Sequence, residues 1–428
     1  MENRYDKYKD SGIAWIGEIP EHWEVKKGKN LFKKEERPVR ENDEIITCFR
    51  DGEVTLRSNR RTDGFTNAMK EVGYQGVRKG DLVIHNMDAF AGAIGVSDSD
   101  GKSTPVYSVC TPKYNTDANV YYYAYLLRSY ALGGVIQSLA KGIRERSTDF
   151  RYKEFGDLFY QQPPIKEQQS IATYLDQKCS EIDELITLQE EMITKLQSYK
   201  QSVITEAVTK GLDKNVPLKD SGIAWIGEIP EYWEVIKTKN AFKIISGATP
   251  KTDNMTYWDG EIIWITPADY KTEDRIIKSG KRNITLAGLN SCGTSIVPEN
   301  SIIFSKRAPI GLVAINVVPL CTNQGCISCI PKSFVSSKYF YYLMSVLTEW
   351  FELFGSGTTF KELSTNNFAN FSLSQPPLSE QQSIADYLDQ KCSEIDALIS
   401  IKKQKIEKLK DYKKSLIFEC VTGKRKVS

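Results

Sequence analysis

The sequence predicts an α+β protein with a pseudo-two-fold internal repeat, in which two mixed α/β domains alternate with two long helices. Two blocks of sequence recur almost unchanged. Residues 9–25 recur as residues 219–235 with one change, and residues 162–183 recur as residues 375–396 with three changes. The stretches between these blocks are similar in length but differ in sequence. The chain therefore consists of one unit that is used twice.

The repeat also predicts where the parts of the chain begin and end. We call the short blocks at 9–25 and 219–235 the cassettes. The predicted parts are an N-terminal conserved cassette at 1–25, a first variable domain at 26–161, a central conserved helix at 162–218, a repeated cassette at 219–235, a second variable domain at 236–374 and a C-terminal conserved helix at 375–428.

The composition is that of an ordinary folded protein. The 428 residues include 57 basic and 55 acidic side chains, and 40% of the residues are hydrophobic, which excludes disordered and collagen-like classes. No apolar run reaches the roughly 18 residues of a membrane span, and the polar N-terminus lacks the apolar stretch of a secretory signal. We therefore expect a cytoplasmic protein without membrane contact, in which the nine cysteines are free thiols.

The charge of the two variable domains suggests what they bind. Residues 26–161 contain 22 basic and 18 acidic side chains, and residues 236–374 contain 14 and 10, so each domain carries a net charge of +4. This excess is a weak sign of a polyanionic partner.

A long helix is predicted after each proline pair, Pro163-Pro164 and Pro376-Pro377, because more than 40 glycine-free residues follow. The helices should end near Gly211 and Gly423. A heptad pattern fits two interpretations: either each helix packs on its own domain, or the two helices pair about a pseudo-two-fold axis. The predicted heptad seam consists of Ile182, Leu185, Gln189, Met192, Leu196, Tyr199 and Val203, and of Ile395, Leu398, Lys402, Lys405, Leu409, Tyr412 and Leu416.

The variable domains are predicted to share one scaffold. Short β-rich runs at 81–84 and 301–304 and aromatic helical stretches at 121–127 and 339–347 indicate a mixed α/β fold in both. Residues 80–86 align with 300–306, and residues 94–96 align with 310–312. Different side chains on one scaffold are expected of two modules that read different sequences.

Basic and amide side chains near the turns are the candidate DNA contacts, since Arg and Lys bind guanine or phosphate and Asn and Gln bind adenine. Any single one of them can equally be a solvated surface residue. The candidates in the first domain are Arg57, Asn59, Arg60, Arg61, Asn86, Lys141, Arg144 and Arg146. Those in the second domain are Lys306, Arg307, Asn323, Gln324 and Lys361, together with the hydroxyl side chains of Thr358 and Thr359.

One motif suggests an enzyme. The sequence FGSGTT at 354–359 resembles the loop that binds S-adenosylmethionine in DNA methyltransferases, but it follows an apparent helix and lacks an acidic-proline pair. The nearest matches to the second methyltransferase motif, QPPI at 162–165 and QPPL at 375–378, have the wrong first residue and no aromatic. A fused two-domain DNA adenine methyltransferase with its own S-adenosylmethionine loop therefore stays as the alternative function.

Metal and hydrolytic chemistry have little support. Cys321, Cys326 and Cys329 have the spacing of part of an iron–sulfur motif, but buried strand thiols explain them better. With only His22 and His85 in the chain, neither a histidine metal site nor a hydrolase triad can be assembled, and no Walker loop is present. We expect a chain with no catalytic residue and no bound metal.

The doubled motifs carry a family resemblance over essentially the whole chain. The sequences SGIAWIGEIPExWEV and PPxxEQQSIAxYLD, each present twice, together with the long helices, resemble the DNA specificity subunit of type I restriction-modification systems. In the second domain, the segments GATP at 247–250, TNQ at 322–324 and GSGT at 355–358 also resemble common target-recognition segments. The first domain departs from this pattern at 35–38 and 142–146.

The resemblance implies a non-catalytic adaptor. Two target-recognition domains would each read one half of a split double-stranded DNA target, held apart by two antiparallel coiled-coil helices. The chain would bind no cofactor. Two modification subunits that use S-adenosylmethionine to methylate adenine N6 would dock on the helices and cassettes, and restriction subunits that use ATP and Mg would join them. A system that has lost restriction and only methylates would use the same kind of chain.

Overall fold

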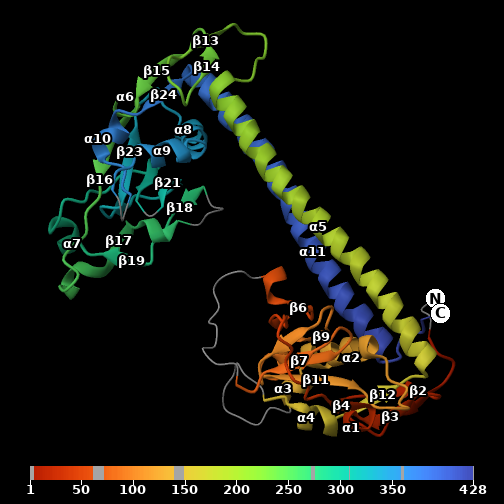
Figure 1. Cartoon of the computed structure of the whole chain (residues 1–428). Helices are drawn as coiled ribbons and strands as arrows, with labels where there is room; N and C mark the ends of the chain where they lie inside the picture. Colours follow the sequence, from red (N-terminus) through yellow and green to blue (C-terminus); the bar gives the residue numbers. More distant parts are fainter. Residues whose placement is uncertain are drawn as a thin grey trace. The chain divides into compact units, whose positions relative to one another are not determined.

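The computed structural model describes residues 4–60, 72–138, 149–270, 275–307, 309–357 and 361–427. The chain forms two compact units. The first contains residues 1–189 and 404–428, and the second contains residues 190–403 (Figure 1). None of the described helices has an apolar stretch long enough to span a membrane.

The first unit is built on a four-stranded antiparallel sheet of order β4-β11-β8-β9. The strands are β4 (Phe32–Lys34), β8 (Leu82–His85), β9 (Ile94–Val96) and β11 (Tyr107–Pro112). Along β8, Leu82 and Ile84 join the core formed with helix α2 (Val120–Leu132), whereas Val83 joins a second core on the opposite face. This alternation is the two-residue period of a strand that is buried on both faces.

Short elements surround this sheet. They are β5 (Ile46–Cys48) paired with β6 (Val54–Leu56), β7 (Gln75–Val77) paired with β10 (Gly101–Ser103), η1 (Arg57–Asn59), η2 (Ala89–Ala91), α1 (Gly28–Leu31), α3 (Val135–Ser138) and α4 (Tyr152–Asp157).

The second unit is built on a five-stranded sheet of order β16-β23-β20-β21-β18. The strands are β16 (Phe242–Ser246), β18 (Ile276–Ile277), β20 (Ile302–Lys306), β21 (Ile310–Asn316) and β23 (Cys326–Pro331). Helices α8 (Ser337–Ser345) and α9 (Thr348–Leu353) pack on β21. A smaller sheet contains β17 (Trp258–Ile265), β19 (Arg282–Ile284) and β22 (Cys321–Thr322), and the short elements are α6 (Thr238–Ala241), α7 (Leu286–Asn290), α10 (Thr365–Ala369), η3 (Met255–Tyr257) and η4 (Pro267–Asp269).

The two variable domains share a scaffold, as the alignment of their sequences predicts. The strand order β4-β11-β8-β9 in the first corresponds to β16-β23-β20-β21 in the second. The residue that follows β8 and the last residue of β20 also make the same backbone contact: the carbonyl of Asn86 accepts from the N–H of Phe150 at 3.1 Å, and that of Lys306 accepts from Leu363 at 2.9 Å. The predicted alignment of residues 80–86 with 300–306 is confirmed.

The cassettes fold alike. The hairpin of β1 (Tyr8–Asp10) and β2 (Glu18–Pro20) has the same register as that of β13 (Leu218–Asp220) and β14 (Glu228–Pro230). The following strands, β3 (Glu24–Lys27) and β15 (Glu234–Lys237), pair with β12 (Phe159–Gln162) and β24 (Ser372–Gln375).

Each cassette packs on the C-terminal end of a long helix within its own unit. Gly423 and Gly211 both adopt a φ of +74°, which ends a helix in the left-handed conformation that glycine favours. A side chain on Gly423 would collide with Pro20, and one on Gly211 would lie 3.3 Å from Trp233.

The long helices are α5 (Ile165–Lys210) and α11 (Leu378–Val421). In the first unit, the N-terminal part of α5 packs on the C-terminal part of α11, and Asp183 pairs with Lys413 at 2.6 Å. In the second unit, the C-terminal part of α5 packs on the N-terminal part of α11, and Lys200 pairs with Asp396 at 2.7 Å. The helices therefore pair antiparallel in each unit while also packing on the domains.

The predicted seam is wrong at five of its fourteen positions. Ile182, Gln189, Val203, Ile395 and Leu416 are buried, and Leu196, Lys402 and Leu409 are partly buried. The intermediate positions Leu185, Tyr199, Leu398, Lys405 and Tyr412 are exposed, and Met192 is partly buried. Their places are taken by the next residues: Ile399 and Ile406 are buried, and Ile186, Lys200 and Lys413 are partly buried. Seam positions that alternate in steps of three and four residues fit a heptad whichever step comes first. A lysine can occupy such a position because its aliphatic stem lines the seam while its amine reaches an aspartate.

Candidate nucleic-acid interface

The second-domain candidates meet at one end of the sheet. Strand pairing places the end of β16 and the start of β23 together, with Ser246 opposite Ile327. Lys306 at the end of β20 lies opposite Ile310 at the start of β21. A backbone bridge between Arg307 and Glu362 adds the segment from residue 361 to the same edge. The structure thus brings together five candidates from three segments that are distant in sequence: Lys306, Arg307, Asn323, Gln324 and Lys361.

These five side chains are not equally available to a ligand. The Lys306 amine is mostly buried and pairs with Glu362 at 2.8 Å, whereas the half-exposed Arg307 lies 3.8 Å from the same carboxylate. Asn323 uses its side-chain oxygen to accept from the N–H of Gly325, which fixes the turn. Gln324 and Lys361 are exposed. Arg307, Gln324 and Lys361 therefore form the accessible part of this surface.

Among the described residues, the corresponding sheet end of the first domain has fewer available groups. Asn86 lies there but is buried, and its side-chain oxygen accepts from the Ser108 hydroxyl at 2.8 Å. Arg60 is held by Asp51 and Glu53, both at 2.7 Å.

The two remaining described candidates of this domain lie on η1 and bind neighbouring threonines. The Arg57 Nε lies 3.3 Å from the Thr47 hydroxyl, and the Asn59 amide lies 2.8 Å from the Thr55 hydroxyl. These contacts order the side chains before any ligand binds. The remaining candidates, Arg61, Lys141, Arg144, Arg146, Thr358 and Thr359, lie outside the described residues.

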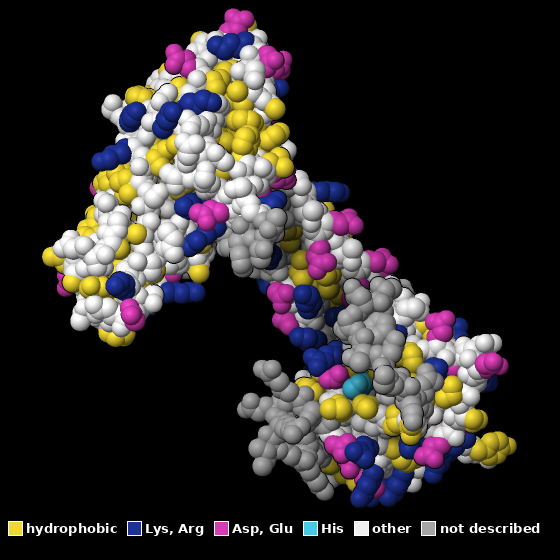
Figure 2. Space-filling view, turned by 60° about the vertical axis from the view of Figure 1, so that its left-hand side comes forward, with side chains coloured by type: hydrophobic (Ala, Val, Ile, Leu, Met, Phe, Trp, Pro, Cys, Tyr) yellow, Lys and Arg dark blue, Asp and Glu magenta, His cyan; other side chains and the backbone are white. Residues whose placement is uncertain are grey.

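The face drawn in Figure 2 has no large patch of one charge. Basic and acidic side chains are interspersed in both units. This agrees with the small net charge of each variable domain and indicates that any recognition of DNA depends on individual side chains more than on a broad field.

Sequence reasoning missed His85 as a member of the first-domain surface. It ends β8 directly before Asn86, its Nδ1 accepts from the N–H of Asp88 at 3.0 Å, and its ring contacts Tyr107 edge-on. Burial lowers the pKa of His85 below its usual value, so the ring is neutral at pH 7. Its position one residue before a candidate at a strand end was the signal that could have found it.

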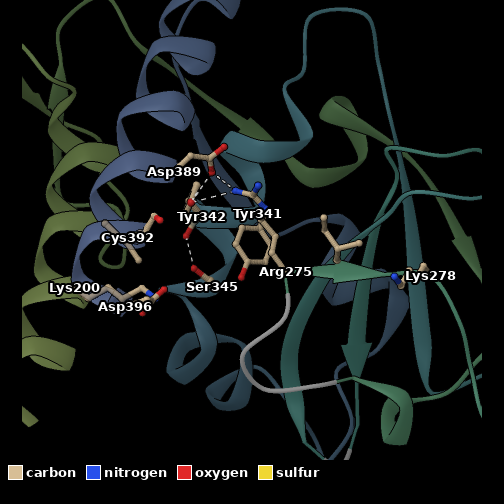
Figure 3. Close-up of a pocket in the computed structure, with 12 residues that line it drawn as sticks. Lys200, Arg275, Lys278, Tyr341, Tyr342, Ser345, Asp389, Cys392 and Asp396 are labelled. Carbon is tan, nitrogen blue, oxygen red and sulfur yellow. Dashed lines mark hydrogen bonds and ion pairs between the residues drawn. The ribbon is translucent and has the colours of Figure 1, made fainter. Parts of the chain in front are cut away.

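A pocket in the second unit differs from the candidate surface, because ion pairs line it (Figure 3). It has a volume of about 640 Å³ and lies between β18, α8 and the two long helices. Asp389 on α11 binds Arg275, accepts from the Tyr342 hydroxyl at 2.7 Å and pairs with Lys338 at 3.0 Å. Lys200 pairs with Asp396. Both carboxylates are paired with cations of the same cluster, so the cluster ties the domain to the helix.

The Asp389 cluster has a simpler counterpart in the first unit. Burial favours the neutral acid, but hydrogen bonds from Arg275, Tyr342 and Lys338 outweigh it and hold the pKa of Asp389 below its usual value. In the first unit, Asp176 accepts from the Tyr125 hydroxyl at 2.8 Å, and none of the described cations forms an ion pair with it.

The cysteine spacing does not produce a metal site. Cys321, Cys326 and Cys329 belong to three separate core clusters, with Cys326 and Cys329 on opposite faces of β23. Burial raises the pKa of Cys321 and of Cys326 to about 12, so these thiols are protonated and poor ligands. Among the described residues, no group of three or more His, Cys, Asp or Glu side chains can hold a metal ion.

The glycine loop near residue 355 also differs from a cofactor loop. It follows helix α9, and its Ser356 backbone pairs with Glu362 at the sheet end. Gly355 lies close to Ile310, where a side chain would be crowded. This loop therefore packs at the sheet end that carries the candidate surface.

Comparison with known proteins gives one family. Residues 230–411 match the type I restriction modification DNA specificity domain. The MjaIX specificity subunit of a type I restriction enzyme from Methanocaldococcus jannaschii is 41% identical over 185 residues, which cover 42% of both chains. The putative MjaX specificity subunit of the same organism is 28% identical over 428 residues, covering 96% of both chains.

Solved structures agree with this fold. A chain from a study of the assembly and conformational transition of the type I R-M system has a TM-score of 0.72 at 15% identity, covering 94% of this chain and 98% of its own length. The HsdS subunit from Thermoanaerobacter tengcongensis has a TM-score of 0.58 at 16% identity, covering 95% and 98%. Residues 230–411 therefore match the type I restriction modification DNA specificity domain, and the chain is similar over nearly its whole length to a specificity subunit of a type I restriction enzyme and to the fold of an HsdS subunit.

Proposed function

We propose that this chain reads a split double-stranded DNA target and performs no chemistry of its own. The variable domains at 26–161 and 236–374 would act as two target-recognition domains, each for one half of the target. The observation that carries this proposal is that both domains place different side chains at the same end of one shared sheet. One scaffold with two sets of exposed groups suits two different half-sites.

The conserved parts suit two copies of one partner. Large apolar side chains are exposed at repeat-related positions of the paired helices: Leu185 is 44% exposed and Leu398 is 48% exposed, while Tyr199 is 57% and Tyr412 is 50% exposed. Exposed apolar groups at regular places favour a protein interface. Two modification subunits would dock there and on the cassettes.

The chemistry would reside in the partners. The modification subunits would bind S-adenosylmethionine and methylate adenine N6, and restriction subunits would use ATP and Mg. The complex would act on DNA in the cytoplasm. This proposal includes the domain boundaries predicted from the repeat. It also includes the pairing of the two long helices as a coiled coil that joins the two target-recognition domains.

The test is selection from a random duplex DNA library with the chain co-purified with its modification partner, followed by mapping of methylated adenines. We expect a split motif with an unread gap and one methylated adenine in each half. One continuous site, or methylation by this chain without a partner, would contradict the proposal.

A further inference from the structure

The loop that follows β16 lies on the candidate surface and is fixed to it. We call residues 247–254 the anchored loop. The backbone of Gly247 runs so close to the carbonyls of Thr322 and Asn323 that no side chain would fit. The N–H of Ala248 then donates to the Thr322 carbonyl at 3.0 Å. The anchored loop therefore begins in direct contact with the turn that carries Gln324.

Two buried tryptophans hold the rest of this loop. The Trp264 indole N–H donates to the Ala248 carbonyl at 3.0 Å, and that of Trp258 donates to the Lys251 carbonyl at 3.2 Å. Trp258 is 3% exposed and Trp264 is 7% exposed, and the two rings meet edge to face. Asn254 closes the loop by accepting from the N–H of Thr256 at 3.1 Å. A loop with this many backbone anchors holds its side chains in fixed positions before DNA binds.

One side-chain contact links the anchored loop to the candidate residue on the turn. The Thr249 hydroxyl donates to the Oε1 atom of Gln324. Gln324 is exposed, and among the described residues nothing accepts a hydrogen bond from its Nε2 amide. The amide therefore presents its two donors, and one remaining lone pair of Oε1, to solvent.

We propose that Thr249 and Gln324 act together to read one adenine of the second half-site, an inference that rests on the proposed function. An amide with one acceptor and one donor on the same edge matches adenine N6 and N7 in the major groove. Gln324 is the base-contacting residue, and Thr249 is a positioning residue that fixes which way the amide faces. Lys251, exposed on the same loop, contributes a phosphate contact.

The test compares three variants in the full complex with the modification partner. Thr249→Val keeps the shape of the side chain and removes its donor. In library selection it should reduce the preference for adenine at one position of the second half-site by about tenfold, with the first half-site unchanged. Thr249→Ser keeps the hydroxyl and should retain the preference.

The matched control lies on the same loop. Lys251→Met should weaken binding to all sequences alike and reduce the slope of binding against salt by about one, without changing the base preference. Thermal melting of each variant measures whether the fold is intact.

The outcomes separate the inference from the function on which it rests. If wild type selects a split motif and Thr249→Val leaves it unchanged, the inference is wrong and the proposed function stands. Loss of preference spread over both half-sites, or at a position that is not A·T, also overturns the inference. If wild type selects no split motif, the proposed function fails and this inference fails with it.

Discussion

At the residue scale, the sequence predicted candidate side chains but could not predict their contacts. Lys306, Arg307 and Gln324 stand out as basic and amide residues near turns, and the fold places them at one sheet end. The sequence could not show that Glu362 pairs with Lys306, or that Asn323 uses its oxygen within the turn. These are tertiary contacts between segments that no local pattern relates.

The Asp389 cluster yields a pH-dependent prediction at this scale. Because the pKa of Asp389 is lowered in the folded state, its contribution to stability is present above the unfolded pKa of about 4 and is lost as the pH falls through the lower folded pKa. Asp389→Asn should cost about 1 kcal/mol at pH 7, or about 3 °C in melting temperature. The difference from wild type should shrink below about pH 4.

Asp176→Asn is the matched control, because among the described residues Asp176 accepts a side-chain hydrogen bond only from Tyr125. Its effect at pH 7, measured by the same melting experiment, should be smaller. Equal losses for the two variants, or a loss at Asp389 that does not decrease at all as the pH falls below about 4, would show that the ion pairs do not stabilise the fold.

At the element scale, the existence of the long helices was predictable and their contact face was not. Glycine-free sequence between Pro-Pro and Gly marks both helices, and α5 and α11 begin and end within two residues of these signals. The seam was ambiguous because Leu185 and Ile186, like Leu398 and Ile399, offer apolar side chains on adjacent stripes. Which stripe is buried depends on contacts with the partner helix, and the spacing of residues in the sequence does not show these contacts.

One adjacent pair of residues tests the corrected seam. Ile399 is 8% exposed, whereas Leu398 is largely solvent-exposed. Ile399→Ala should destabilise the isolated chain by about 2–4 kcal/mol, because it removes buried methyl groups and leaves a cavity. Leu398→Ala should change stability by less than about 0.5 kcal/mol but weaken binding of the modification subunit. Melting of the chain alone and a binding titration with the partner measure the two effects, and the reverse order of stabilities would restore the original seam.

At the scale of the whole molecule, the repeat was the most informative feature of the sequence. Identity between residues 162–183 and 375–396 predicted equivalent helices, and the structure gives the two helices equivalent ion pairs, Asp183 with Lys413 and Asp396 with Lys200. In the proposed function, base specificity would depend on loops such as 247–254. Tryptophans from another sheet hold the backbone of this loop, so no local sequence pattern shows which side chains the loop presents.

The repeated helices lead to a prediction about the spacing between half-sites. If the paired helices set this spacing, deleting residues 187–193 and 400–406 together should shorten it. Seven residues are almost two helical turns, so the seam keeps its register while each helix loses about 10 Å. That length corresponds to about three base pairs of DNA at the usual repeat of about 34–36 Å per 10–10.5 pairs.

Library selection with the deleted chain should return both half-sites unchanged with a shorter gap. Its affinity should be lower, because three base pairs also rotate one half-site about the DNA axis. An unchanged gap would show that the helices do not determine the spacing.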